Sequence, residues 1–165
     1  KAIIPNISVP IQNLIVTFAS SGQNLDTGCK IVHIGKNTTS TVHSKSISKN
    51  GGASFYRGLL RVMPEATGTK ATVECESLML DNISSSDTIP IIDIRNDSVD
   101  IGHEAKIGRI SDEAIFYLMT RGINEDEAKA MIVRGFVEPI SKELPLEYAV
   151  ELNKLIELEL EGTIG

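Results

Sequence analysis

The feature that most constrains this chain is a change of hydrophobic period at Ser111. Before it, residues 14–110 form short β-favouring runs that are broken by Gly, Asn, Asp and Ser, which is the spacing of an all-β structure. After it, apolar residues recur with the period of an α-helix. The sequence therefore predicts a mainly β unit over residues 1–110 and a smaller helical unit over residues 111–165.

The turns between the β-favouring runs bear on the type of β structure. The expected strands are 14–18, 29–34, 41–48, 54–57, 59–62, 71–76, 77–80, 89–94 and 100–104. Asn50-Gly51-Gly52 is the only clear tight-hairpin signal, and the other breaks are irregular. Irregular corners with small residues favour a stacked β-helix, although no strict repeat is visible. The pattern by itself leaves both a β-helix and a hairpin sandwich open.

Composition limits the classes of protein to consider. Hydrophobic residues make up 41% of the chain and aromatic residues only 4%, so one core filled by aliphatic and small side chains is expected. The net charge of -6 without a basic cluster argues against nucleic acid as a partner. The apolar runs are far shorter than the roughly 20 residues that cross a bilayer, so no membrane span is expected.

The cysteine content and the start of the chain suggest its setting. Cys29 and Cys75 are the only cysteines, and they do not make the dense framework of a small secreted protein, so we expect a reducing cytoplasmic compartment. The chain begins at Lys1 and enters a strand-like pattern at once. We therefore expect it to be a fragment of a longer polypeptide.

Capping signals predict three helices after the β runs. The first is expected from the cap Ser111 to Gly122, the second from the cap Asn124 to Gly135, and the third from Pro145 to about residue 161. The residues expected to face inward are Ile115, Leu118, Met119, Ala128, Met131, Ile132, Ala149, Leu152 and Ile156. Three short helices cannot bury all of these on one another. They must pack on the β unit or keep a face open for a partner.

Few residues point to chemistry. Cys75 lies between two glutamates, which raise a thiol pKa unless a metal or cation is close, and a thiol in such a run is more often a small buried residue. Cys29 has only this structural interpretation. His103 and Glu104 are adjacent in a strand, so at most one of them faces any given ligand. Cys75 with either residue makes part of a metal site, which a partner chain would complete.

Known catalytic and nucleotide-binding motifs are missing from the sequence. Neither a phosphate-binding glycine loop nor a cysteine-nucleophile motif is present, so we expect no enzyme activity and no ATP bound by this chain itself. A carbohydrate-active β-helix is also disfavoured, because such enzymes use aromatic platforms for sugars and this chain has few aromatic residues.

Collinear segments along most of the chain resemble the SufB/SufD family, the scaffold subunits of the SUF iron–sulfur cluster assembly system, and in particular its SufB branch. These segments are 31–41, 46–48, 56–59, 75–80, 103–105, 116–118, 121–123, 135–136, 144–151 and 161–165. SufD-like chains usually have glycine at the position of Glu104 and commonly lack a cysteine at that of Cys75. Many SufB sequences carry an acid where this chain has Gly102.

The resemblance implies a right-handed parallel β-helix followed by a small C-terminal helical domain. It implies that the β-helix pairs with a SufD-like paralogue or with a second copy of the chain. Cys75 would accept sulfur and hold a transient iron–sulfur cluster, expected to be [4Fe–4S], with Glu104 and then His103 as further ligands. A flavin, FAD, is associated with the assembled complex, and the setting would be the cytoplasm or, in a eukaryote, the plastid stroma.

The resemblance also assigns the helical unit to the ATPase SufC. We expect Phe116, Arg121, Met131, Arg134 and Phe136 to contact SufC. For any single one of these residues, covering the end of the β-helix is an equal alternative. At the level of the whole chain, a SufD-like adaptor that positions SufC without holding a cluster is the rival hypothesis.

Overall fold

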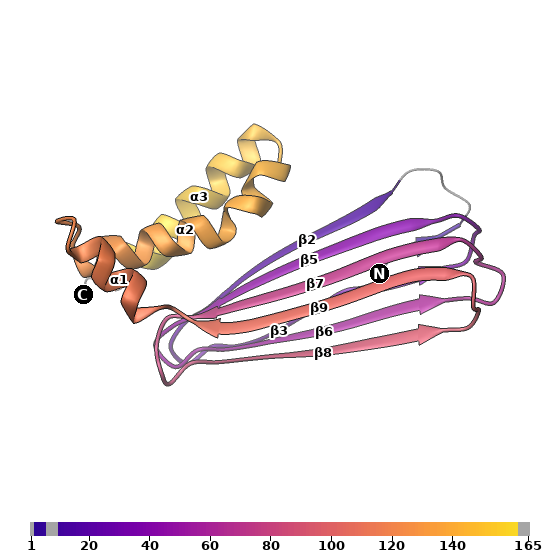
Figure 1. Ribbon diagram of the computed structural model, residues 1–165, viewed down its shortest axis with the longest axis horizontal. Helices are drawn as coiled ribbons and strands as arrows, with labels where there is room; N and C mark the ends of the chain where they lie inside the picture. Colours follow the sequence, from indigo (N-terminus) through magenta and orange to yellow (C-terminus); the bar gives the residue numbers. More distant parts are fainter. Residues whose placement is uncertain (1, 6–9, 162–165) are drawn as a thin grey trace.

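The computed structural model describes residues 2–5 and 10–161, which form a parallel β-solenoid followed by three helices (Figure 1). The chain alternates between two sheets. The first sheet holds β1 (Ala2–Ile4), β3 (Asn24–Thr27), β4 (Lys30–His33), β6 (Ala53–Val62) and β8 (Ser85–Ile94). The second holds β2 (Ile11–Ala19), β5 (Thr39–Ser48), β7 (Thr69–Met79) and β9 (Val99–Arg109).

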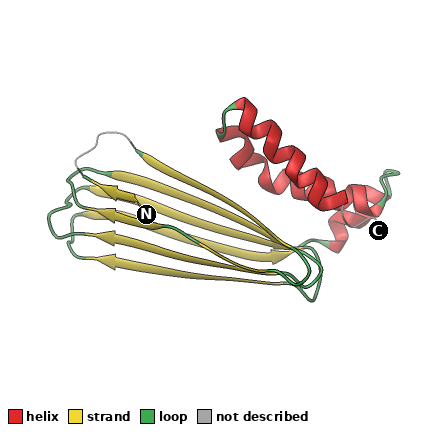
Figure 2. Ribbon diagram, turned by 180° about the vertical axis from the view of Figure 1, so that it is seen from behind, coloured by secondary structure: helices red, strands yellow, loops and turns green. Residues whose placement is uncertain are grey.

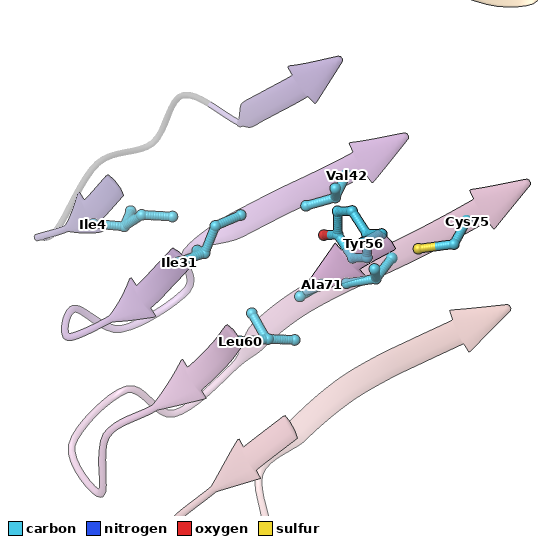
Figure 3. Packing of buried hydrophobic residues seen from close by; sticks show 8 residues of the cluster. Ile4, Ile31, Val42, Tyr56, Leu60, Ala71 and Cys75 are labelled. Atoms are coloured by element: carbon cyan, nitrogen blue, oxygen red, sulfur yellow. The ribbon is translucent and has the colours of Figure 1, made fainter. Parts of the chain in front are cut away.

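Every strand pair in both sheets is parallel. A sandwich built of hairpins would pair neighbouring strands antiparallel, so the predicted β-helix is confirmed and the sandwich is wrong. The interior between the sheets is lined by residues that alternate along the strands, as Figure 3 shows for eight of them. This core consists of Ile4, Ile31, Val42, Tyr56, Leu60, Ala71, Val73 and Cys75.

Strands β3 and β4 behave as one strand with a break at Gly28 and Cys29. Both pair with β6, one after the other. A Cβ atom at Gly28 would lie 1.9 Å from the carbonyl oxygen of Arg57, so only glycine allows this close approach.

The sequence did not predict β3. Conversely, β6 and β7 are each continuous where the sequence predicted two shorter strands.

The three helices are α1 (Asp112–Met119), α2 (Glu125–Glu143) and α3 (Leu146–Glu161). Both predicted N-caps are confirmed: Ser111 accepts a hydrogen bond from the amide of Ala114 and Asn124 accepts one from the amide of Glu127. The predicted end of the second helix at Gly135 is wrong. Val137 and Ile140 continue its buried stripe beyond the glycine, and that burial outweighs the cost of about 1 kcal/mol for glycine in a helix.

Helices α2 and α3 pack on the outer face of the second sheet, near the end where the strands lead into the helices (Figure 2). Ile47 on β5 is fully buried beneath Val133, Val137 and Ile156. Of the residues expected to face inward, Ile115, Ala128 and Ile156 are buried, whereas Met119 and Met131 are exposed. No described helix has the length and apolar character needed to span a membrane.

Candidate functional site

Cys75 lies on the inner face of β7 and is 3% exposed. Its sulfur points into the interior, on the side of Tyr56 (Figure 3). Burial raises the pKa of the Cys75 thiol, the Thr88 hydroxyl opposes that rise, and Cys29 adds to it. The isolated thiol is therefore largely protonated at neutral pH, and a bound metal would have to displace the proton.

The register places His103 and Glu104 on opposite faces of β9. Ala105 is the partner of Cys75, His103 is the partner of the inward-facing Val73, and Glu104 is the partner of Glu74 on the outer face. Because side chains alternate along a strand, Glu104 lies on the other side of the sheet from Cys75. The structure therefore does not bring Cys75 and Glu104 together as the resemblance implied, and His103 is the residue that shares the face of Cys75.

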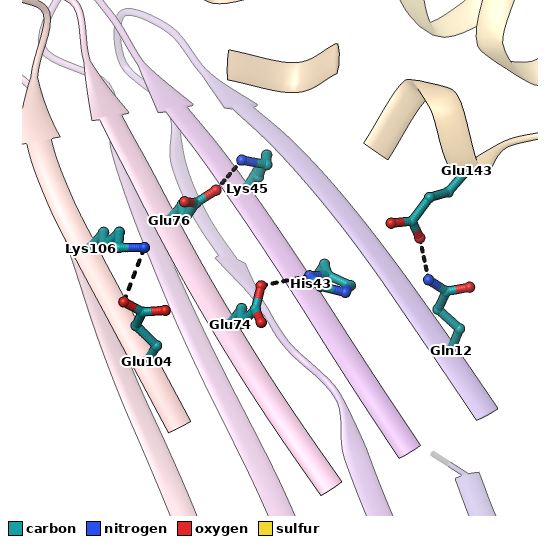
Figure 4. Close-up of polar contacts among 8 residues, drawn as sticks. All are labelled: Gln12, His43, Lys45, Glu74, Glu76, Glu104, Lys106 and Glu143. Atoms are coloured by element: carbon teal, nitrogen blue, oxygen red, sulfur yellow. Dashed lines mark hydrogen bonds and ion pairs between the residues drawn. The ribbon is translucent and has the colours of Figure 1, made fainter. Parts of the chain in front are cut away.

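Glu104 belongs to a row of ion pairs on the outer face (Figure 4). Its carboxylate lies 3.0 Å from the ammonium group of Lys106 and its side chain is 60% exposed. In the same row, Nδ1 of His43 lies 3.1 Å from the carboxylate of Glu74. The hydrogen bond from Lys106 to Glu104 raises the pKa of Lys106. Within residues 2–5 and 10–161, no three His, Cys, Asp or Glu side chains are placed to hold a metal ion.

The last coil of the solenoid leaves an open end. Strand β8 pairs with β6 alone and strand β9 with β7 alone, so each has one edge unpaired among the described residues. Ile92, Ile94 and Ile107 lie on the inward-facing positions of this coil and are exposed. Long edges with exposed apolar side chains are templates for pairing with another chain. Cys75 lies one strand from this edge.

Sequence reasoning missed the surroundings of Cys29. The Cys29 sulfur lies 3.3 Å from the hydroxyl oxygen of Tyr56, so this packing residue also contacts a polar group of the interior. Burial and then the contact with Cys29 raise the pKa of Tyr56. Gly58 makes room for the tyrosine, because a Cβ atom there would lie 2.7 Å from its hydroxyl oxygen. No motif marks this contact, since it joins two coils through the register.

A chain of serine hydroxyls crosses the interior beside Cys75. Ser48 donates to Ser54, Ser54 to Ser86 and Ser86 to Ser77, at distances of 3.1, 2.9 and 2.8 Å. The sequence carries one signal for it, because serine recurs at inward positions of the strands where apolar residues are usual. The hydroxyls therefore act as hydrogen-bond partners for one another.

The five residues expected to contact SufC differ in exposure: four are exposed, and Phe136 is partly buried. Phe116 is 69% exposed and Met131 is 43% exposed. Arg121 and Arg134 are also exposed and lie against Tyr117 and Glu157. Phe136 instead faces the solenoid, where its ring lies 4.4 Å from the ammonium group of Lys45.

A groove of about 480 Å³ runs between α1, the start of α2 and the end of the solenoid. Ile110, Ile115, Phe116 and Met119 supply its apolar side, and Arg109 and Lys129 are among its charged residues. Of the expected SufC-contacting residues, Phe116 lines this hollow, which another protein could fill.

Comparisons with known proteins decide the family. The profile described as "SUF system FeS cluster assembly, SufBD core domain" matches residues 10–136. The chain belongs to the SufBD family. An iron–sulfur cluster assembly SufBD family protein of Mycobacterium leprae is 55% identical over 152 residues, which cover 92% of this chain and 18% of that protein. One of Staphylococcus epidermidis is 54% identical over 152 residues, which cover 92% of this chain and 33% of that protein.

The matches define how far the family assignment reaches. The SufBD core profile includes Cys75, His103, Glu104 and the helical residues up to Phe136. The chain spans a third or less of the length of these curated relatives. These matches establish membership of the assembly family, and the structure establishes the solenoid. The activity and partners of the whole SufBD protein extend beyond the part that this chain covers.

Proposed function

We propose that this chain is part of a SufB-type scaffold on which an iron–sulfur cluster is assembled, with Cys75 as the residue that accepts sulfur and holds the nascent cluster. The observation that carries the proposal is the position of Cys75, one strand from the open end of a SufBD solenoid. Among the described residues, Ala105, a small residue with an exposed side chain, is its pairing partner on that side. A modest movement of β9 opens the thiol to a neighbour.

The open end also supports a partner subunit. A second solenoid, from a SufD-like paralogue or another copy of this chain, can pair with the free edges of β8 and β9 and cover the exposed isoleucines. Such a partner supplies the ligands that Cys75 and His103 lack. Glu104 then acts from the outer face of the seam. A thiolate with mixed, incomplete ligation holds a cluster weakly enough to release it.

The helical unit, residues 111–165, is proposed to recruit the ATPase SufC. The exposed Phe116 and Met119 on α1 line the groove, and Met131 on α2 and Arg121 are exposed as well, which supports this assignment. The ring of Phe136 packs on Lys45 of the solenoid. Its proposed effect on SufC is therefore indirect, because it holds α2 in place on the second sheet. The cargo is proposed to be [4Fe–4S], any FAD belongs to the assembled complex, and the two free cysteines suit a cytoplasmic setting.

Anaerobic reconstitution of the full-length protein with its partner subunits, ferrous iron and sulfide tests the proposal. The Cys75→Ala variant should lose cluster formation and transfer to an apo-acceptor. Cys29→Ala is the matched control, because it removes the other cysteine of the chain and should retain both. Cluster formation by Cys75→Ala at the parent's level would show that Cys75 is not the acceptor.

A second candidate function is a structural adaptor that positions SufC without binding a cluster. The observation in its favour is that Cys75 is buried while Glu104 lies on the opposite face of the sheet. This alternative predicts that variants of both residues assemble clusters normally, whereas Phe116→Ala weakens SufC binding and cluster delivery together. The same reconstitution therefore separates the two candidates.

A further inference from the structure

Thr88 carries a buried hydroxyl that makes no regular hydrogen bond within the described part of the fold. Its oxygen is inaccessible to solvent and has no hydrogen-bond partner among residues 2–5 and 10–161. Most buried hydroxyl groups are paired, because leaving one unpaired costs stability. An orphaned group of this kind beside a candidate ligand needs an explanation.

The register shows what Thr88 faces. Residues 86, 88 and 90 of β8 point inward, and Thr88 stacks below Tyr56. Across the interior, the Ser86 hydroxyl donates to that of Ser77 at 2.8 Å, so the inner faces of β8 and β7 touch at this level. Cys75 lies two residues before Ser77 on β7, and Thr88 lies two residues after Ser86 on β8. The side chains of Cys75 and Thr88 therefore face each other one step along the interior. The Thr88 hydroxyl acts to lower the pKa of the Cys75 thiol, against the larger rise from burial, which agrees with this placement.

We propose that the Thr88 hydroxyl donates a hydrogen bond to the Cys75 sulfur when that thiolate holds the nascent cluster. This inference rests on the proposed role of Cys75. A thiolate bound to iron accepts a hydrogen bond more strongly than a thiol does, so the hydroxyl gains a full partner in the loaded state. Thr88 is then a positioning residue, which orients the sulfur and stabilises the reduced cluster.

The test uses Thr88→Val, which removes the hydroxyl at nearly constant shape, and Thr88→Ser, which keeps it. Thr72→Val is the control, since Thr72 lies on the same strand as Cys75 but on the outer face. Each variant is reconstituted in the full-length complex, and the midpoint reduction potential of the cluster is measured. Thr88→Val should shift it to a more negative value, Thr88→Ser should restore it, and Thr72→Val should leave it unchanged.

The cluster-free protein supplies a second readout. Because the hydroxyl is unpaired there, Thr88→Val should not lower the midpoint of thermal unfolding. A lowered unfolding midpoint with an unchanged potential would assign Thr88 a structural role and overturn the inference. If Cys75→Ala abolishes the cluster but Thr88→Val keeps the parent potential, this inference fails and the proposed function stands. If Cys75→Ala still assembles clusters, the proposed function itself fails.

Discussion

The interior packing around Tyr56 makes a quantitative prediction for Gly58→Ala. A Cβ atom at position 58 would lie 2.7 Å from Oη, 2.8 Å from Cε1 and 3.0 Å from Cζ of Tyr56. These contacts are too short, so the ring must move in a core that is closed on both sides by sheets. Overpacking of this kind costs about 1–3 kcal/mol. At roughly 2–4 °C per kcal/mol for a chain of this size, the thermal midpoint should fall by about 2–12 °C.

Gly108→Ala is the matched control for this experiment. Gly108 lies on β9, and a Cβ atom there would have no neighbour within 4 Å, so the midpoint should change by less than about 2 °C, the equivalent of a surface substitution. Thermal unfolding followed by circular dichroism measures both variants. In a Tyr56→Leu background, the cost of Gly58→Ala should largely disappear, because the crowded ring is gone. Equal midpoints for Gly58→Ala and Gly108→Ala would refute the packing argument.

Three further predictions concern acid stability, a helix cap and the SufC surface. His33 is fully buried between the hydroxyls of Thr38 and Ser40, and burial lowers its pKa. The unfolded chain therefore binds the proton first, so stability should be complete above the unfolded value of about 6.5 and fall as the pH drops below it. In His33→Gln, the urea midpoint of unfolding should depend less steeply on pH across this range. Asn124→Ala removes the cap of α2 and should cost about 1 kcal/mol in urea unfolding, whereas Asn153→Ala on the exposed side of α3 should cost little. Arg121→Glu should weaken SufC binding measured by calorimetry, and unchanged affinity would move the dock to α3.

Local signals predicted the division into a β unit and helices, whereas the choice of a β-helix over a sandwich came from the family resemblance. The change of period at Ser111 marks the place where β9 ends and α1 begins, and the caps Ser111 and Asn124 start their helices as expected. Local signals failed where tertiary burial decided the outcome. Gly135 should end a helix by propensity, but the buried stripe through Val137 carries α2 past it.

The site was less accessible to sequence reasoning than the fold. Alternation along β9 did predict that His103 and Glu104 face opposite ways, and the register confirms it. Which of them shares the face of Cys75 depends on the exact pairing of β7 with β9, and a one-residue slip would exchange the two. The contact between Cys29 and Tyr56 likewise depends on stacking between coils.

The most direct test of the account is whether iron binds at position 75. Selenocysteine can be placed at this position in the full-length protein, which is then assembled with its partners and reconstituted anaerobically. X-ray absorption at the selenium edge then reports the atoms bound to that one side chain. The account predicts an iron neighbour of selenium in the loaded complex, and a spectrum with carbon alone as the bonded neighbour, in a complex that does contain a cluster, would contradict it.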